Sequence, residues 1–421
     1  MSGTGRAAFW SVAAAIGFLI PGATAWPQDE PTKAGAENRP ISRAESLEFG
    51  KSLVEAFTRL DAQAIDRAID YDAMLEAATE GVKVPPHLRN EFLKGAKEAQ
   101  ERGGPPLLAE FRPAIQAGAD LRATKAIEWQ GRPACLLRMI LPERSVAYIL
   151  FFLERAADGH IRAVDHYSLA AGESAASAVR RIYLAAVAQA NRGIVDRLFG
   201  KEEALVKHIG DLERMVTANR EGKAAEALKI YDALPEEVKR EKIFQTMRFA
   251  ASQNVGDDAK YLEAIQDFAR RFPGDPACDF LLIDGHLLTN PPEPEKSLEC
   301  IDRLEKALDG DAYLTVLRGN ILMTMNRTDD ALAAYRAAID AEPDLRPAYD
   351  GLLSAAMVAK RFKDVAAMLD AMESVFDEEI VDLSELEEFD EFLASPEGKA
   401  WTEKREKTKP EPSPEDDATK T

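Results

Sequence analysis

The sequence predicts an α+β protein in which helices and a curved antiparallel sheet come first and an all-helical solenoid follows. Apolar residues recur at the helical period in the first part of the chain, change to a period of two between about residues 121 and 169, and then return to the helical period. Farther along, one interval separates Gly285 from Gly319, and the same interval separates Ser297 from Ala331 and Ala331 from Val365. Self-similarity at a period of about 34 residues is typical of helix pairs that bury their apolar faces against their neighbours.

The N-terminus has the features of a cleaved signal peptide. Arg6 precedes a largely apolar run from Ala7 to Ile20, which is too short to span a bilayer comfortably. Ala23-Thr24-Ala25 then provides an A-x-A cleavage pattern. We therefore expect residues 1–25 to be removed and the mature protein to be extracytoplasmic, periplasmic or secreted, with no insertion in the membrane. An uncleaved membrane anchor is the alternative interpretation.

Helices open the mature chain after a polar, proline-containing leader over residues 26–41, which we expect to be flexible. Ser42 and Glu45 have the spacing of a capping box, which predicts the start of a helix. Asp61 is a typical N-cap for a short second helix. A third helix is expected after Pro85-Pro86, because proline is favoured in the first turn.

Four strands follow, because apolar and polar residues alternate between turn signals. Glycine-containing turns at Gln130-Gly131-Arg132 and Ala157-Asp158-Gly159 join them into two hairpins. The predicted strands are Leu121 to Trp129, Ala134 to Leu141, Val146 to Glu154 and Ile161 to Leu169. Residues 42–175 therefore form one α+β domain, and residues 176–204 continue as connecting helices.

The order of elements in residues 42–175 resembles that of the NTF2-like (cystatin-like) domains, in which helices pack into a cone-shaped sheet. Val164-Asp165-His166-Tyr167 and Ala171-Gly172-Glu173-Ser174 look like the last strand and the exit of such domains. The resemblance implies a concave side that can hold a small molecule.

Asp165 and Tyr167 are the candidate pocket residues of this domain. Alternation along the strand puts Ile161, Ala163, Asp165, Tyr167 and Leu169 on one face, so Asp165 is a carboxylate on an apolar surface. In a pocket, burial would raise its pKa and suit it to act as a base. The alternative is that Asp165 is hydrogen-bonded to the backbone or to an arginine, because buried charges are usually paired.

Residues 205–376 resemble the tetratricopeptide repeat (TPR) family. In the repeat that starts at Ala312, Gly319 is the small residue of helix A, Tyr335 is the aromatic residue of helix B, and Pro343 ends that helix. Other repeats are marked by Tyr349 and Leu352, by Gly285, Ser297 and Ile301, by Ala264 and Phe268, and by Ala227, Tyr231 and Pro235. An irregular helical bundle is the alternative.

The TPR resemblance implies a concave groove lined by helix A of each repeat. Val316 and Leu282 stand where the family's clamp for a peptide carboxylate needs lysine, so this clamp is not expected. Methionines among apolar and polar side chains suit adaptable contact with an extended or helical peptide. The alternative is that these residues pack against one another. The groove residues are Leu282, His286, Val316, Asn320, Met323, Asp350, Ser354 and Met357.

A strongly acidic segment follows the repeats. Residues 377–391 hold nine acidic residues and no basic one. Apolar residues recur at helical spacing inside it and up to Trp401, so we expect one capping helix over 377–401 that covers the last repeat while its acids face water. A cation-binding tail is the alternative. Residues 402–421 are rich in Pro, Lys and Glu and are expected to be disordered.

Composition and motifs argue against catalysis and nucleic-acid binding. The net charge is -20, from 73 acidic and 53 basic residues, whereas nucleic acid needs a basic face. The five histidines lack metal-ligand spacing, and neither a Gly-rich phosphate loop nor a GxSxG motif occurs. We therefore expect no cofactor, no metal and no catalytic residue. Cys135, Cys278 and Cys300 are interpreted as buried small hydrophobes, not as a disulfide framework.

The leading hypothesis is an exported, non-enzymatic TPR protein that acts as a protein–protein interaction scaffold or adaptor for a protein or peptide partner. The alternative is small-ligand binding, or a lyase- or isomerase-like activity, in the NTF2-like domain. The identity of the partner and the oligomeric state are left open.

Overall fold

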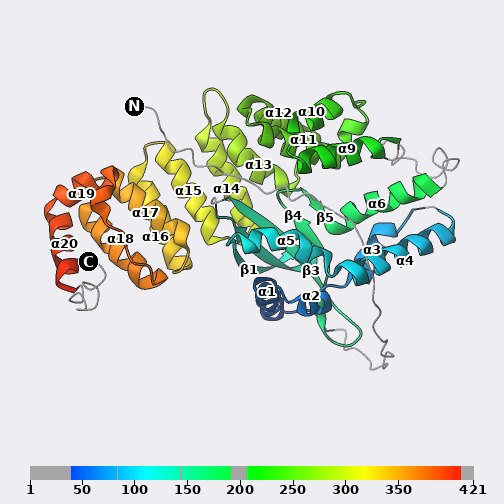
Figure 1. Cartoon of the computed structure of the whole chain (residues 1–421), viewed down its shortest axis with the longest axis horizontal. Helices are drawn as coiled ribbons and strands as arrows, with labels where there is room; N and C mark the ends of the chain where they lie inside the picture. The colour runs from blue at the N-terminus through cyan, green and yellow to red at the C-terminus, as the bar shows by residue number, and fades with distance from the viewer. Residues whose placement is uncertain (1–38, 83, 143–144, 191–204, 206, 409–421) are drawn as a thin grey trace, which may run out of the picture. The chain divides into compact units, whose positions relative to one another are not determined.

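The computed structural model describes residues 39–82, 84–142, 145–190, 205 and 207–408. The chain divides into two compact units, Met1–Asp309 and Gly310–Thr421, so the boundary falls inside the range 205–376 predicted as one repeat region. The predicted α+β class is confirmed: an antiparallel sheet lies in the N-terminal part and an all-helical region follows it (Figure 1). The predicted signal peptide lies outside the described residues.

The first unit begins with short helices whose starts follow the predicted capping signals. In α1 the Glu45 amide donates to Ser42 Oγ at 3.2 Å and the Ser42 amide donates to Glu45 Oε2 at 3.0 Å, which completes the predicted capping box. Two helices were not predicted: Asp70 caps one of them, and Pro105-Pro106 begins the other. The five helices are α1 (Arg43–Thr58), α2 (Ala62–Ala68), α3 (Tyr71–Thr79), α4 (Pro86–Gly103) and α5 (Pro106–Gln116).

The sheet has five strands in sequence order, each antiparallel to its neighbour, and the four predicted strands are confirmed. Gln130 and Gly131 both have positive φ, of 52° and 79°, which is the conformation that a two-residue hairpin turn requires. The strands are β1 (Asp120–Trp129), β2 (Arg132–Ile140), β3 (Val146–Arg155), β4 (Ile161–Ser168) and the short β5 (Glu173–Ser174).

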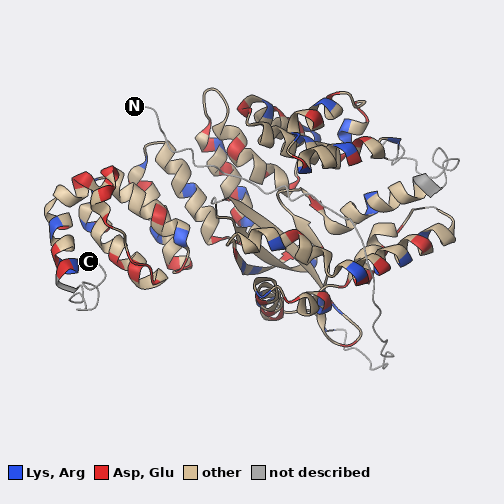
Figure 2. Ribbon diagram, viewed as in Figure 1, with Lys and Arg blue, Asp and Glu red and all other residues tan. Residues whose placement is uncertain are grey.

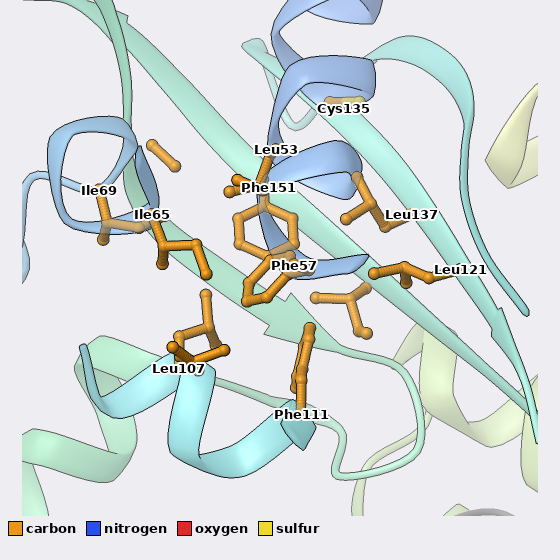
Figure 3. Packing of buried hydrophobic residues seen from close by; sticks show 14 of the residues in the cluster. Leu53, Phe57, Ile65, Ile69, Leu107, Phe111, Leu121, Cys135, Leu137 and Phe151 are labelled. Atoms are coloured by element: carbon orange, nitrogen blue, oxygen red, sulfur yellow. The ribbon is translucent and has the colours of Figure 1, made fainter. Parts of the chain in front are cut away.

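One face of the sheet is covered by α1, α2 and α5 around an aromatic centre (Figure 3). The rings of Phe57 and Phe111 lie 4.9 Å apart between centroids, and Phe151 of β3 is fully buried beside them. Gly50 allows α1 to approach β2, since a Cβ there would overlap Cys135 Sγ. Burial raises the pKa of the Cys135 thiol to about 12. All three cysteines are free and buried, as predicted.

The rest of the first unit is helical. A second core joins α4 and α6 to the helices that follow, through Leu88, Tyr183, Met215 and Phe244 among others. α11 is the central helix, because nearly all of its residues from Ile243 to Gln253 are buried. The helices are α6 (Ala175–Ala190), α9 (Ile209–Arg220), α10 (Ala224–Asp232), α11 (Lys242–Val255), α12 (Asp258–Arg271), α13 (Pro276–Leu287) and α14 (Pro294–Leu308).

The second unit contains two successive helix pairs at a fixed period. The first helices of the two pairs begin at Ala312 and Arg346, and the second helices begin at Thr328 and Phe362. The two first helices start as many residues apart as Gly285 and Gly319, and so do the two second helices. The period predicted from the sequence is therefore present in the helix boundaries. These helices are α15 (Ala312–Thr324), α16 (Thr328–Ala341), α17 (Arg346–Val358) and α18 (Phe362–Phe376).

Tyr335 of α16 fixes the distance between these helices. Its ring is 2% exposed and lies between two glycines, Gly319 of α15 and Gly351 of α17. A Cβ on Gly319 would lie 2.5 Å from the ring, and one on Gly351 would lie closer still. Contacts under 3.0 Å are essentially never found for real Cβ atoms, so both glycines are needed for the ring to fit.

The C-terminal cap differs from the single helix predicted over 377–401. Two short 3-10 turns, η3 (Leu383–Glu385) and η4 (Glu387–Phe389), precede α19 (Asp390–Ala394) and α20 (Pro396–Thr408). Leu386 between the turns is extended, and Ser395 is extended before Pro396, because a residue that precedes proline disfavours the helical conformation. Leu383, Phe389 and Phe392 are buried as expected, whereas Leu386 is 37% exposed.

α20 nevertheless covers the last helix pair. Trp401 Nε1 donates to Asp370 Oδ1 of α18 at 2.8 Å, and the Trp401 ring packs against Phe392. Throughout the part of the chain that the structure describes, no helix combines the length and the apolar character needed to cross a membrane.

We predict that Gly351→Ala lowers the free energy of unfolding by about 1–3 kcal/mol, because the added methyl group forces the Tyr335 ring out of its place. Chemical denaturation measures the change. Gly95→Ala is the matched control, since Gly95 is also inside a helix but a Cβ there meets nothing within 4 Å. That variant should gain about 0.5–1 kcal/mol. Equal effects of the two changes would contradict the role given to Tyr335.

The capping box predicts a pH dependence. Hydrogen bonds from the Ser42 amide and hydroxyl, and from Arg155, lower the pKa of Glu45 to about 2. The folded-state pKa is below the unfolded value of about 4.3, so this contribution is fully present above that value and is lost as the pH falls toward 2. Glu45→Gln should flatten the acid limb of the stability curve between these values. Glu48→Gln, which removes an exposed carboxylate from the same helix, should leave that limb unchanged.

Candidate functional site

The predicted groove residues divide between the two units. Leu282 and His286 belong to α13 of the first unit, and the other six belong to α15 and α17 of the second. On α13, Leu282 is half-buried against the neighbouring core, and His286 Nδ1 lies 3.5 Å from Glu293 Oε2. Burial lowers the pKa of His286, and the Glu293 carboxylate partly opposes that effect. Leu282 thus packs toward α11 and α12, and His286 pairs with the residue that precedes α14.

The predicted groove residues on α15 serve mainly in packing. Val316 is 2% exposed and is part of the interior. Asn320 Oδ1 accepts a hydrogen bond from the Tyr335 hydroxyl at 2.7 Å, so its side chain completes the environment of the buried ring. Met323 is half-buried. Packing against neighbours, the alternative interpretation of the groove, therefore describes Val316 and Asn320.

The predicted groove residues on α17 lie on the side of the helix that faces away from its buried residues. Asp350, Ser354 and Met357 are spaced by four and three residues, and Val358 continues the same face. Ser354 is exposed, Met357 is half-buried and Val358 is 63% exposed. We call these four residues the α17 stripe. The opposite side of the helix is buried, through Tyr349, Leu352, Ala355 and Ala356.

Arg346 stands at the start of the α17 stripe. Its Nε donates to Asp350 Oδ1 at 3.1 Å, and its Nη1 forms an ion pair with Glu378 of the acidic segment. Burial acts to lower the pKa of Arg346, but the hydrogen bonds that it donates to the Glu378 and Asp350 carboxylates raise it, so the guanidinium stays charged. The stripe therefore begins at a fixed positive charge that is already shared by two acids.

The predicted alternation of β4 is wrong at one point. Asp165 pairs with Phe152 while Ala163 pairs with Leu153, so Val164 is an extra residue in the strand. Such a bulge reverses the alternation on either side of it. Ala163 consequently lies on the face that carries the aromatic core, whereas Asp165 and Tyr167 lie on the opposite face.

Asp165 is a buried carboxylate with backbone partners. Its Oδ1 accepts from the His166 amide at 2.8 Å and from the Ala176 amide, in the first turn of α6, at 3.0 Å. The side chain is therefore held at the start of a helix, where a negative charge is favoured. This matches the alternative interpretation of Asp165, a carboxylate hydrogen-bonded to the backbone.

Tyr167 takes part in a polar link between the sheet and the helices that the sequence did not reveal. Its hydroxyl donates to Asp275 Oδ1 at 2.8 Å, and burial and the Asp275 charge raise its pKa. Asp275 also accepts from the Ala277 amide at 2.9 Å as the N-cap of α13, and forms an ion pair with Lys242 of α11. The sequence signal for this position was Asp275-Pro276, because an N-cap residue followed by proline marks the start of a helix.

Lys242 is surrounded by aromatic rings. Its Nζ lies 5.7 Å from the ring centroids of Tyr167, Phe268 and Phe272, within the range of cation–π attraction. Tyr167 is bonded to Asp275, whereas Asp165 accepts from the backbone amides of His166 and Ala176. The two candidate pocket residues therefore have separate structural partners.

No family model, curated protein or solved structure matches the chain. Within the described residues, no group of three or more His, Cys, Asp and Glu side chains is placed to hold a metal ion.

We predict that Asp275→Asn lowers the free energy of unfolding by about 1.5–3 kcal/mol, because asparagine keeps the N-cap acceptor but removes the charge that Lys242 and Tyr167 share. Tyr167→Phe in the Asp275→Asn background should cost less than in the wild type, since the two side chains are coupled. Denaturant unfolding of the four proteins measures this. Strictly additive losses would show that the hydrogen bond between them contributes nothing.

Proposed function

We propose that this chain is an exported, non-enzymatic protein-interaction scaffold whose second unit holds a protein or peptide partner. The observation that carries the proposal is the α17 stripe, where Ser354 and Val358 are exposed on a helix whose other side is buried. Val358 is 63% exposed at the end of a well-packed helix, so a partner that covers it removes apolar surface from water. That burial makes the free energy of binding more favourable.

The helix period supports the assignment of the second unit to the TPR type. Paired helices that recur at the period of the sequence, with Tyr335 between small residues of both flanking helices, are what such repeats require. Arrays of this kind expose one helix of each pair along a continuous surface, and binding on that surface needs no cavity. We propose an NTF2-like assignment for residues 42–175 on the order of helices and strands, with a structural role for Asp165.

The side chains of the α17 stripe suit contact with the side chains of a peptide in a helical or extended conformation. Met357 supplies a flexible apolar surface that adapts to different partners. The Ser354 hydroxyl both donates and accepts hydrogen bonds. Val358 adds a rigid aliphatic surface at the end of the stripe. A helix or an extended strand laid along α17 would meet these side chains in order, as in recognition of helical peptides by grooves.

We expect co-purification from the native host to recover a protein partner with the full chain, and to lose it with the double variant Ser354→Arg and Val358→Asp. Both positions are exposed, so the fold should be kept. The matched control is Ile182→Asp, which adds a charge at an aliphatic residue of the first unit. Ile182 is also exposed, at 39%. Mass spectrometry of the bound fraction gives the result. An identical set of bound proteins for all three chains would overturn the proposal.

A further inference from the structure

The acidic segment, residues 377–391, is tied to both ends of α17. Glu378 pairs with Arg346 at the start of that helix. Glu391 Oε2 lies 2.7 Å from Nζ of Lys360, just beyond the end of the helix. The two ends of the segment are thus held near the two ends of the helix that carries the α17 stripe, so the segment and the stripe border the same region of the second unit.

Most of the negative charge of this segment has no cation beside it. In the part of the chain that the structure describes, six of its nine carboxylates form no ion pair: Asp377, Glu379, Glu385, Glu387, Glu388 and Asp390. Residues 310–408 as a whole hold 22 acidic and 11 basic residues, so the excess is not balanced elsewhere in the unit. Figure 2 shows acidic residues at α19, the helix that begins within this segment.

Exposed aliphatic side chains gather in the same stretch of chain. Among the described residues, four of the five large apolar side chains that are exposed lie between residues 358 and 386. They are Val358 at 63%, Val375 at 41%, Val381 at 67% and Leu386 at 37%. Val381 and Leu386 lie inside the acidic segment itself. A segment that served only to keep the protein soluble would have no need for exposed aliphatic residues among its carboxylates.

Charge and apolar surface together define one class of partner. We propose that the acidic segment and the α17 stripe bind a basic amphipathic segment of a partner protein, with lysine or arginine residues facing the carboxylates and aliphatic residues covering Val381, Leu386 and Val358. This rests on the proposed function, because it assigns the partner class for the same unit. Nucleic acid and anionic lipid are excluded as occupants, since their phosphates would meet unneutralised carboxylates.

The test uses the full chain and short fluorescently labelled peptides of equal length, with binding followed by fluorescence anisotropy at about 0.15 M salt, where long-range charge attraction is largely screened. The probes are an amphipathic Lys/Leu helix, a Lys/Ser peptide of equal charge, and a Glu/Leu helix of equal apolar content. We expect the Lys/Leu peptide alone to bind well. Replacing Glu379, Glu385, Glu387 and Glu388 by Gln should weaken it at least about tenfold.

A matched variant separates a local site from net charge. Glu48, Glu91, Glu101 and Glu128 of the first unit are exposed and form no ion pair with described residues, so their replacement by Gln changes the net charge equally. That quadruple variant should bind the Lys/Leu peptide as the parent chain does. Val381→Ser with Leu386→Ser should weaken the same peptide by about five- to tenfold, at positions that are already exposed.

Three outcomes would overturn the inference. The first is equal weakening by the two quadruple variants, and the second is equal binding of the Lys/Ser and Lys/Leu peptides. The third is binding of the Glu/Leu peptide alone, lost in the Ser354→Arg and Val358→Asp chain; this would keep the scaffold function and reject a basic partner. Failure of the scaffold function itself is detected separately, by co-purification that yields the same proteins with and without the α17 stripe.

Discussion

The packing of one tyrosine ring between two glycines sets the geometry of the second unit. The Tyr335 ring occupies the space that side chains at Gly319 and Gly351 would otherwise fill, so it packs directly against the backbone of α15 and of α17. The hydroxyl is satisfied by Asn320, which avoids an unpaired polar group in the interior. With one side of α17 committed to this contact, its other side remains at the surface, and the stripe that we assign to partner binding is a consequence.

Polar residues in the first unit are used in a different way. Asp165, Tyr167, Lys242 and Asp275 each hold one element against another: a strand to the start of α6, and the sheet to α11 and α13. Half-buried charges of this kind are stable only when paired and hydrogen-bonded. Each of these side chains therefore has a structural partner within the first unit.

The sequence predicted those parts of the structure that depend on neighbours along the chain. The capping box at Ser42, the four strands and the helix period all result from local spacing and turn chemistry. The bulge at Val164 was not predictable, because it depends on how β4 pairs with β3. Periodicity likewise predicts which residues share a face of a helix, but not how deeply that face is buried. Val316 was therefore expected to line a groove, although it is buried.

Contacts between residues that are far apart in the sequence could not be predicted either. The repeat interval relates Gly319 to Leu353 and not to Gly351, although the two glycines contact the same ring from opposite sides. Lys242 and Asp275 are separated in the chain by the whole of α12, and no local pattern relates them. On α17, by contrast, Ser354 is exposed and Asp350 and Met357 are half-buried, because the side opposite the buried face of a helix follows directly from its period.

The contact between α20 and α18 limits how copies of the chain can associate. Each helix pair in a stacked array offers the next pair an apolar surface, and an array without a closing element offers that surface to another molecule. Trp401 and its hydrogen bond to Asp370 occupy this position. Head-to-tail association through the side of α18 that α20 covers would build open filaments with no fixed length, and it would first require this C-terminal helix to be displaced.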